Sequence, residues 1–301
     1  MANTTYNFAK AVSLTDYFEN FVTGKDNYRW DWQQLVTMKQ TNRMTEQVFS
    51  RYGLPTPIQV GQFEPITFYD MGELAATTFT AVKYGIATSF SYELLKFDWQ
   101  ITDLMGKAGK SMGQGHAYLR DRLVAEQFND ITTNTAFDSV AICGTHTMTG
   151  GQSVDNDLTA ASLDFDNLWG SINYFNTSMY NHSGQRITAK PKFVITNPVN
   201  QKILEKILSA SGEPDTSDLN NPNTIKSLYD LKAVYCPHLS STTQYILASD
   251  EFPGDFYFFS VDEPKYEEDA DFDRHGLKLK SWQIFALGIK DFVNVVNNAG
   301  A

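Results

Sequence analysis

The sequence predicts an α+β fold, and three segments carry that prediction. Residues 191–235 are typical of a strand, a capped helix and a second strand. Residues 59–87 carry the β-forming side chains of a long two-stranded ribbon. Residues 103–130 show the apolar spacing of one long helix.

The composition predicts a chain with a sizeable core and an acidic surface. It has 301 residues, of which 42% are hydrophobic, and a formal net charge of −11. A chain of this length usually folds as one large domain or two small ones. The charge disfavours a protein that coats nucleic acid, because phosphate binding needs an excess of Lys and Arg. It permits a protein that encloses nucleic acid without adhering to it.

The cysteine content and the hydropathy predict a soluble protein made inside the cell. Cys143 and Cys236 are too few for a disulfide framework, which favours the cytoplasm. Residues 1–5 are polar and do not form a signal peptide. No apolar run approaches the roughly 18 residues that a membrane span requires.

The N-terminal quarter of the chain is expected to form an arm and then a ribbon. Residues 1–50 show little periodicity, and a few apolar side chains could anchor them: Trp30, Trp32, Leu35, Val36 and Met38. Residues 59–69 and 77–87 are expected to be strands joined by a turn at 70–73. A lone ribbon is marginal in water, so we expect a neighbouring subunit to cover it.

The helix predicted at 103–130 would be about 40 Å long at 1.5 Å per residue. Its expected apolar stripe contains Leu104, Met112, Leu119, Leu123 and Phe128, and its wetter positions are Lys107, Lys110, Arg120, Asp121 and Arg122. Gly106, Gly109 and Gly113 lie near one face, although each costs about 1 kcal/mol relative to Ala. We expect a flat face that packs closely against a crossing backbone.

The second half alternates shorter elements. Residues 150–156 predict a boundary, and Asp164 and Asp166 mark the start of a helix. Within residues 191–235, Asn197 and Pro198 are expected to open a helix that Gly212 ends. Residues 211–224 are predicted to form a mobile loop. Strands are expected at 245–248, 256–260 and 277–292, with an acidic stretch before the last and a bend at Gly288.

One short motif suggests a nucleophile. Residues 109–113 match the Gly-x-Ser-x-Gly pattern of a hydrolase elbow around Ser111. That elbow requires a buried strand directly before the serine, whereas the residues before Ser111 are expected to be helical. A phosphate-binding loop would need glycine where Leu104 stands. A packing face made of small residues is therefore the favoured interpretation.

Two further groups could bind a metal. Cys143, His146, Cys236 and His238 form a ligand set that zinc accepts, but their long separation and Pro237 favour buried thiols and loop histidines. Asp269, Asp271 and Asp273 alternate, so in an extended segment they would share one side. They could bind a cation or a neighbouring subunit, although a solvated face is the default and no EF-hand spacing is present.

The remaining histidines, His116, His182 and His275, have no catalytic partner that the sequence identifies. The chain therefore offers no convincing active site, which favours an architectural role.

The order of these segments resembles a known family. The ribbon is followed by residues 84–95, one long helix, the α/β stretch beginning at 191–198, an aromatic strand pair and the closing segment 287–296. From about Tyr52 onward, this order is similar to that of tailed-phage major capsid proteins of the Hong Kong 97 type, of a Mu-like or related branch.

The resemblance implies a division of the chain into five parts. These are an N-terminal arm (1–50), an extended E-loop ribbon (51–90), a peripheral domain with the spine helix (91–150), an axial domain (151–250) and return strands that complete the peripheral domain (251–301).

The resemblance also implies a function. The chain would be a major capsid protein of the virion, not an enzyme, with no catalytic residue, cofactor or metal. Through pentamers and hexamers it would build an icosahedral shell around double-stranded DNA in the host cytoplasm, without sequence-specific DNA binding and without a membrane. A scaffolding protein, a portal and a maturation protease are expected partners, and a decoration protein is a further candidate.

One departure from the family limits what carries over. Members with covalent cross-links use a lysine of the E-loop, whereas residues 54–82 contain no lysine. Cross-linking of that kind is not expected here. Two alternatives remain: an encapsulin-like compartment shell, which has the same fold, and a serine hydrolase that uses Ser111.

Overall fold

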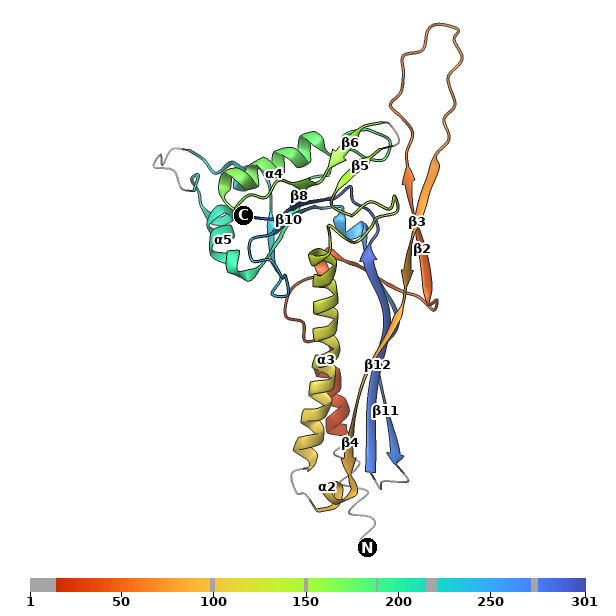
Figure 1. Ribbon diagram of the computed structural model, residues 1–301, viewed down its shortest axis with the longest axis vertical. Coiled ribbons are helices and arrows are strands. Elements are labelled where there is room, and N and C mark those ends of the chain that lie inside the picture. Colours follow the sequence, from red (N-terminus) through yellow and green to blue (C-terminus); the bar gives the residue numbers. More distant parts are fainter. Residues whose placement is uncertain (1–14, 98–100, 149–150, 188, 215–220, 272–275) are drawn as a thin grey trace.

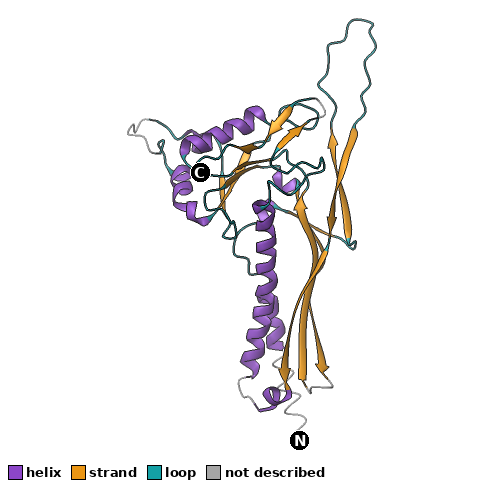
Figure 2. Ribbon diagram, viewed as in Figure 1, coloured by secondary structure: helices purple, strands orange, loops and turns teal. Residues whose placement is uncertain are grey.

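The computed structural model describes residues 15–97, 101–148, 151–187, 189–214, 221–271 and 276–301. The molecule is elongated: a long helix and a long sheet run side by side along its lower part, a second sheet with its helices lies above them, and a ribbon extends beyond the body (Figure 1). Figure 2 shows the long helix beside the long strands in the lower part, and shorter helices around the strands of the upper part. The predicted α+β class is confirmed.

The long sheet has four strands in the order β1-β11-β12-β4. Their bounds are β1 Thr37–Gln40, β11 Phe256–Asp271, β12 Gly276–Ile289 and β4 Val82–Ser91. β11 and β12 pair antiparallel over almost their whole length, β4 pairs antiparallel with β12, and β1 is parallel to β11. β11 continues through the acidic stretch, which was not expected to be a strand. Cross-strand partners such as Lys280 opposite Glu267 offset its charge.

Buried and exposed residues alternate along the first part of β12. Leu277, Leu279 and Phe285 are buried on one side, while Lys278 and Lys280 are exposed on the other. The period of two therefore turns one face toward α3 (Ile101–Asn129), which contacts β12. The long helix was predicted at 103–130 and is confirmed. The short helix α2 (Tyr92–Phe97) directly follows β4 in the chain.

A helix at residues 15–25 lies in a glycine groove of α3. A Cβ on Gly109 would meet the carbonyl oxygen of Tyr17 at 2.3 Å, and one on Gly113 would meet that of Phe21 at 2.4 Å. A Cβ on Gly24 of the crossing helix would likewise meet the carbonyl oxygen of Lys110, at 2.6 Å. The predicted flat face is confirmed, but its partner is a helix, where an extended arm was expected.

Residues 28–36 tie this N-terminal segment into the main core. Trp30, Trp32, Leu35 and Val36 are buried as predicted, whereas Met38 on β1 is half exposed. The indole nitrogen of Trp32 donates to Asp121 Oδ1 at 2.7 Å, and the backbone N–H of Arg29 donates to Oδ2 at 2.7 Å. A 3-10 turn, η1 (Gln33–Leu35), follows.

Two residues of α3 that were expected to be solvent-exposed are buried. Asp121 accepts the bonds described above, and Arg120 donates to Gln283 at 2.8 Å, to Tyr28 at 2.9 Å and to Glu263 at 3.0 Å. The prediction was wrong because both side chains face segments distant in sequence. These segments supply the partners that a buried charge requires.

The second sheet has five strands in the order β7-β13-β10-β8-β9. Their bounds are β7 Asp157–Leu158, β13 Val295–Asn298, β10 Tyr245–Ser249, β8 Pro191–Thr196 and β9 Lys232–Tyr235. β8 and β9 are parallel and flank a helical crossover, which confirms the predicted strand–helix–strand unit. The segment 251–301 thus divides between the two sheets, because its last strand joins β10.

Helices complete the head of the molecule. Asp164 caps α4 (Phe165–Ser178) by accepting from the N–H of Asn167 at 2.8 Å, as its position predicted. Asn197 accepts from Val199 at the start of η2 (Pro198–Asn200), which leads into α5 (Gln201–Ser209). Gly212 does not end that helix, since α5 stops at Ser209 and Gly212 bridges to Pro222 beside α6 (Thr224–Leu228).

The loop predicted at 211–224 lies partly outside the described residues, at 215–220. Its described end is fixed: Asn223 is buried and donates to the carbonyl oxygen of Ile207 at 2.6 Å. The expected boundary at 150–156 falls in a hairpin, β5 (Thr145–Thr147) with β6 (Ser153–Asp155). The last short element, η3 (Phe252–Gly254), precedes β11.

The ribbon differs from the predicted one. It consists of β2 (Thr45–Tyr52) paired antiparallel with β3 (Gly72–Thr80), so residues 59–69 are not a strand and 70–73 are not its turn. Pro55, Pro57 and Pro65 cannot donate to a ladder, which explains the loop. The segment 77–87 is divided at Ala81 between β3 and β4. Gly288 is no bend, because it pairs within β12 and leaves room for Phe79.

The glycine groove gives a prediction about stability. We expect Gly109→Ala to lower the free energy of unfolding by roughly 1–3 kcal/mol, because the new methyl group would overlap the backbone of the crossing helix. The control is Gly115→Ala in the same helix, where nothing lies within 4 Å. It should stabilise by about 1 kcal/mol through helix propensity. Denaturant unfolding measures both, and equal stabilisation by the two variants would contradict the close packing.

Candidate functional site

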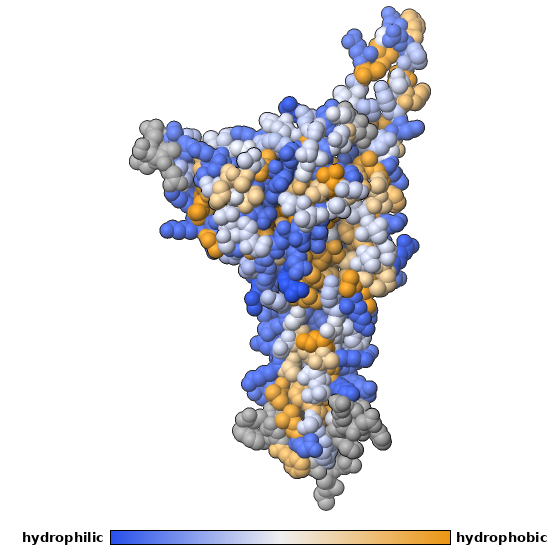
Figure 3. All heavy atoms as spheres, viewed as in Figure 1, coloured by the Kyte–Doolittle hydropathy of each residue, from blue (hydrophilic) through white to orange (hydrophobic). Residues whose placement is uncertain are grey.

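The most exposed apolar side chains lie on the loop that joins β2 to β3. Residues 53–71, called here the ribbon loop, have no regular secondary structure and extend beyond the body (Figure 1). Phe63 is 98% exposed and Phe68 is 96% exposed. The other exposed apolar residues of this loop are Leu54, Ile58, Ile66, Tyr69 and Met71. Figure 3 shows hydrophobic residues at this far end of the molecule.

Such a loop is costly for a lone chain. Extensive exposed apolar surface in a soluble protein marks a surface that another molecule covers. None of the described residues of this chain covers Phe63 or Phe68. The ribbon loop is therefore a candidate interaction surface.

A second, smaller exposed apolar group lies on the helices of the head. Val199 on η2, Ile203 on α5 and Leu228 at the end of α6 are all exposed. The buried face of α5 is formed by Leu204 and Ile207, and Ile203 lies outside it.

The end of the ribbon nearest the body, called here the root, is held by apolar packing and one exposed ion pair. Phe79 of β3 is buried against Phe259 and against the backbone of Gly288. Arg51 and Glu73 form an ion pair across the two strands at 2.8 Å. Because both side chains are largely exposed, that pair contributes little to stability.

The loop after α4 binds the root from the other side. Residues 180–187, called here the strap, form a turn in which Ser183 donates to the carbonyl oxygen of Gly53 at 3.0 Å. Gln185 of the same turn donates to Thr56 Oγ1 at 3.2 Å. The strap therefore fixes the point where the ribbon loop leaves β2.

Both strands of the ribbon also bond to two consecutive residues after β12. Ser50 of β2 donates to Asp291 Oδ2 at 2.9 Å, and Thr77 of β3 donates to the carbonyl oxygen of Lys290 at 3.2 Å. His182 of the strap contacts the same Asp291 oxygen at 2.7 Å. Asp291 thus joins the ribbon, the strap and the end of the long sheet.

Lys290 points to a second buried carboxylate. Its Nζ lies 3.0 Å from Asp255 Oδ1, and Asn294 donates to Asp255 Oδ2 at 2.6 Å. Ser50, His182, Asp255, Lys290 and Asp291 are called here the root cluster. Its four titratable side chains are nearly buried, with at most 15% of any of them exposed.

The pKa values of the two carboxylates shift in opposite directions. Burial and the charge of Asp291 raise the pKa of Asp255 to about 6, because together they outweigh the pairing with Lys290. Burial also acts to raise the pKa of Asp291, yet the hydrogen bond and charge of His182 hold it below its usual value. Burial acts against the Lys290 ammonium, but the Asp255 charge raises the pKa of that lysine.

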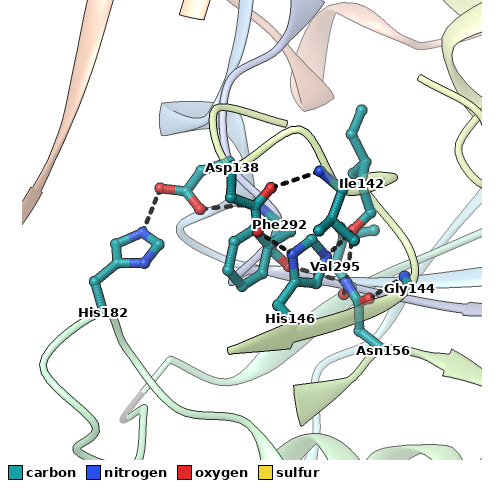
Figure 4. Close-up of polar contacts among 10 residues, drawn as sticks. Asp138, Ile142, Gly144, His146, Asn156, His182, Phe292 and Val295 are labelled. Atoms are coloured by element: carbon teal, nitrogen blue, oxygen red, sulfur yellow. Dashed lines mark hydrogen bonds and ion pairs between the residues drawn. The ribbon is translucent and has the colours of Figure 1, made fainter. Parts of the chain in front are cut away.

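Figure 4 shows a second histidine–carboxylate pair close to the first. His146 Nδ1 lies 2.7 Å from Asp138 Oδ2 (Figure 4). The rings of His146 and Phe292 are stacked at 3.5 Å, while His182 meets Phe292 edge-on at 5.5 Å. Asn156 donates to the carbonyl oxygens of Ile142 and Val295, each at 3.0 Å. This pair fixes the β5–β6 region to residues 292–295 and, among the described residues, does not contact the ribbon.

Ser111 is not at an elbow. It is exposed in the middle of α3, with ten helical residues before it and no strand leading in. The pattern at 109–113 reflects the glycine groove, since Gly109 and Gly113 face the crossing helix.

The proposed zinc ligands belong to two separate local structures. Cys143 and Cys236 are both buried free thiols, and burial raises the pKa of Cys236 to about 12. His146 is bonded to Asp138, and the ring of His238 lies edge-on to Tyr118 at 5.1 Å. Within the described residues, no group of three or more His, Cys, Asp or Glu side chains could hold a metal.

The acidic triplet is only partly visible. Asp269 is exposed on β11 opposite Lys278, whereas Asp273 lies outside the described residues and nothing is described of the Asp271 side chain. The nearby Lys280 bonds to Glu267, and this contact, followed by the charge of Asp269, raises the pKa of the lysine.

The other histidines lie in different settings. His116 is buried, contacts Ser281 Oγ at 2.8 Å, and has its pKa lowered to about 4 by burial and by Arg120. His275 is outside the described residues. No partner for His182 was expected from the sequence, because Asp291 lies 109 residues away and only the fold brings the two together.

Comparison with known proteins decides the family. The sequence model of the family described as phage capsid protein matches residues 74–298. The chain belongs to this family. It is therefore a subunit of a multi-subunit capsid shell, and its place is the virion. No curated protein sequence matches it significantly.

Solved capsids share the fold of this capsid protein. The capsid of cyanophage P-SCSP1u aligns with a TM-score of 0.60 at 10% identity, over 91% of this chain and 89% of the other. The mature capsid of bacteriophage PhiM1 gives 0.60 at 10% identity, over 90% and 87%. A virus-like particle from Pyrococcus furiosus gives 0.54 at 8% identity, over 94% and 96%. The fold is of the Hong Kong 97-like class.

No helix in the described part of this capsid protein has both the length and the apolar character of a membrane span.

The root cluster gives a prediction about pH. A carboxyl whose pKa is raised on folding, such as Asp255, stabilises the fold below its usual value near 4, and this contribution is lost as the pH rises through about 6. We expect the stability of the wild type, relative to Asp255→Asn, to fall by about 1.4 kcal/mol between pH 5 and pH 8, because about one pKa unit of the shift lies above pH 5.

Urea unfolding of both proteins across this range measures the difference. Asp103→Asn is the control, because Asp103 forms only an exposed ion pair with Lys107 and should give a flat comparison. A flat comparison for Asp255→Asn as well would contradict the raised pKa.

Proposed function

We propose that this chain is the major capsid protein of a tailed phage of the Hong Kong 97 type, of a Mu-like or related branch. It assembles through pentamers and hexamers into an icosahedral shell around double-stranded DNA. The ribbon loop carries this proposal, because Phe63 and Phe68 are almost fully exposed in the lone chain and its other apolar side chains are exposed in large part. A second copy in a shell would remove them from water.

The division of labour within the subunit follows the same proposal. The long sheet with α3 is the peripheral domain, the ribbon is the E-loop, and the five-stranded sheet with its helices is the axial domain. The exposed residues Val199, Ile203 and Leu228 lie on that axial domain and suit contact with neighbouring copies.

The charge suits enclosure of DNA without adhesion. A chain with a net charge of −11 repels the phosphate backbone, so packaging and release of the genome are not slowed by binding. A scaffolding protein, a portal and a maturation protease are the expected partners during assembly in the host cytoplasm, and a decoration protein could bind the finished shell.

An encapsulin-like compartment shell would use the same fold for a different cargo. The match of residues 74–298 to a phage capsid family supports the viral assignment. Particles purified with their natural contents should therefore contain DNA, whereas a packaged enzyme without DNA would favour the compartment.

We also propose that the protein is not an enzyme. A fluorophosphonate probe should not label Ser111 above the level seen with Ser111→Ala, because Ser111 is exposed in the middle of a helix and no general base is hydrogen-bonded to it among the described residues. Stoichiometric labelling of Ser111, lost in Ser111→Ala, would contradict this.

The ribbon loop can be tested without disturbing the fold. Replacing residues 55–70 with a short Gly-Ser turn keeps β2, β3 and the buried Phe79 in place. We expect folded monomers or capsomers but no closed shells in negative-stain electron microscopy, because the contact between copies is removed.

The control exchanges polar loop residues, Gln59→Ser with Gln62→Ser, and should assemble normally. The double variant Phe63→Ser with Phe68→Ser should form few closed particles, since burial of each aromatic ring contributes about 1.5–3 kcal/mol. Normal shells from the shortened loop would refute the role of the ribbon in assembly.

A further inference from the structure

The long sheet ends in a strand whose outer edge is open. β4 is terminal in the order β1-β11-β12-β4, and among the described residues no strand pairs with its outer edge. It has ten residues, whereas the terminal strands β1, β7 and β9 of the two larger sheets have four, two and four. Seven of its ten residues are exposed, Gly85 and Ala87 among them.

This edge lacks the usual protection of an exposed strand. Soluble proteins protect long edges with bulges, prolines, charges or a covering element, because an open edge accepts further strands. β4 contains no proline and only one charged residue, Lys83. Its pairing with β12 runs from Val82 to Ser91 without a register shift. The edge is therefore regular and suited to strand addition.

One face of β4 is also hollowed. Phe90 packs in the core shared with α3, so Gly85 and Ala87 belong to the opposite face of the strand. On that face a hollow of about 420 Å³ lies between β4 and β12, and Lys83, Gly85, Ala87 and Trp282 line it. The small residues of β4 leave room there for the side chains of an added strand.

The ribbon loop contains a strand-forming segment without a partner. Residues 66–71, which follow Pro65, read Ile-Thr-Phe-Tyr-Asp-Met, and the first four residue types favour strands. All six are exposed, and none is paired. The loop extends beyond the body, away from β4 of its own chain (Figure 1). A partner for β4 from this loop must therefore belong to a second copy.

The charges of the two segments are complementary. Residues 53–71 contain Glu64 and Asp70 and no Lys or Arg. Lys83 Nζ lies over the ring of Trp282, 5.2 Å from its centre, and no carboxylate of the described residues forms an ion pair with it. An acidic strand could therefore pair with this lysine.

We propose that residues 66–71 of a second copy add to the edge of β4 as an antiparallel fifth strand of the long sheet. The proposal rests on the proposed function, in which a second copy covers the ribbon loop. The register pairs Ile66 with Ala87, Thr67 with Ile86, Phe68 with Gly85, Tyr69 with Tyr84, Asp70 with Lys83, and Met71 with Val82.

The hollowed face fixes this register. In an extended strand Ile66, Phe68 and Asp70 share one face. Phe68 then lies over Gly85, where the hollow accepts its ring. Asp70 lies opposite Lys83, at the distance where oppositely charged cross-strand pairs interact.

The other face of the added strand also meets apolar side chains. Val82 and Ile86 are 48% and 46% exposed in the lone chain, although they lie on the face that carries Phe90. The register places Met71 and Thr67 beside them. The added strand thus covers apolar surface on both faces of β4.

Other arrangements lose these contacts. A slip by one residue would turn Phe68 away from the hollow. Parallel addition with Phe68 at Gly85 would place Asp70 beside Ala87, away from the lysine. Pairing of β4 with β4 of another copy would leave the ribbon loop uncovered.

The contact joins unlike surfaces. Each copy offers a loop to one neighbour and an edge to another, so copies join head to tail. Such contacts close into rings when the rotation between copies permits. This geometry suits the pentamers and hexamers of the proposed shell.

The experiment cross-links assembled particles of the full-length chain that carries Asp70→Cys with Lys83→Cys. Directly opposite residues in an antiparallel pair have Cα atoms about 4.5–5.5 Å apart, within the range of a disulfide. After oxidation we expect most chains to run as linked multimers in non-reducing electrophoresis. The native Cys143 and Cys236 are buried, so the wild type should run as a monomer.

The matched control is Asp70→Cys with Ala87→Cys. Ala87 lies on the same face of β4, four residues from Lys83, which is about 13 Å along a strand. This pair should stay unlinked, as should each single variant. Equal linking by both pairs would overturn the register. Linking by Lys83→Cys alone would show β4 against β4 and would overturn the proposal.

Charge reversal gives a second test that needs no cysteine. Asp70 and Lys83 are both exposed, so their exchange should leave the fold of the lone chain intact. We expect Asp70→Lys to lower the yield of closed particles severalfold, and Asp70→Lys with Lys83→Asp to restore it. An unchanged yield with Asp70→Lys alone would overturn the pairing.

The outcomes separate this inference from the proposed function. Closed particles that contain DNA but show no link between positions 70 and 83 would leave the function standing and remove only the added strand. A wild-type chain that forms no particles would count against both.

Discussion

The antiparallel pairing of β11 with β12 is the interaction on which the rest of this capsid protein depends. These strands are 16 and 14 residues long and pair along nearly their whole length, so together they form a long antiparallel hairpin. One face of β12 receives α3, and its outer edge receives β4. Lys290 and Asp291, which directly follow β12, belong to the root cluster. The position of the ribbon is therefore set by where this hairpin ends.

In a lone chain the body buries its apolar side chains, but the ribbon loop does not. The body is closed: its main core joins both sheets, α3 and the tryptophans of residues 30–32. The ribbon is not closed, because its loop exposes aromatic side chains that nothing in the described chain covers. This separation suits a shell subunit. A preformed body gives every copy the same shape, while the surface that joins copies becomes buried only on assembly.

Local patterns predicted the elements whose stabilising contacts are near in sequence. The apolar spacing of 103–130 gave α3, the Asn197-Pro198 pair gave the start of η2, and Asp164 gave the cap of α4. The ribbon was misplaced because β propensity at 59–69 was outweighed by prolines. The true partner of β3 lay in the segment expected to be an arm. Arg120 and Asp121 were expected in water, because a sequence does not show which distant groups will bond to a charge.

The candidate site divides in the same way. The sequence by itself determined that residues 54–82 hold no lysine, that apolar side chains crowd the loop, and that no catalytic motif stands in a usable context, since these are properties of composition and spacing. Only the tertiary structure decided that Ser50, His182 and Asp291 meet. They come from three segments up to 241 residues apart, and their bonds exist because the end of the long hairpin carries Asp291 between the ribbon and the strap. Contacts at such separations are set by packing of the whole chain, which no local pattern encodes.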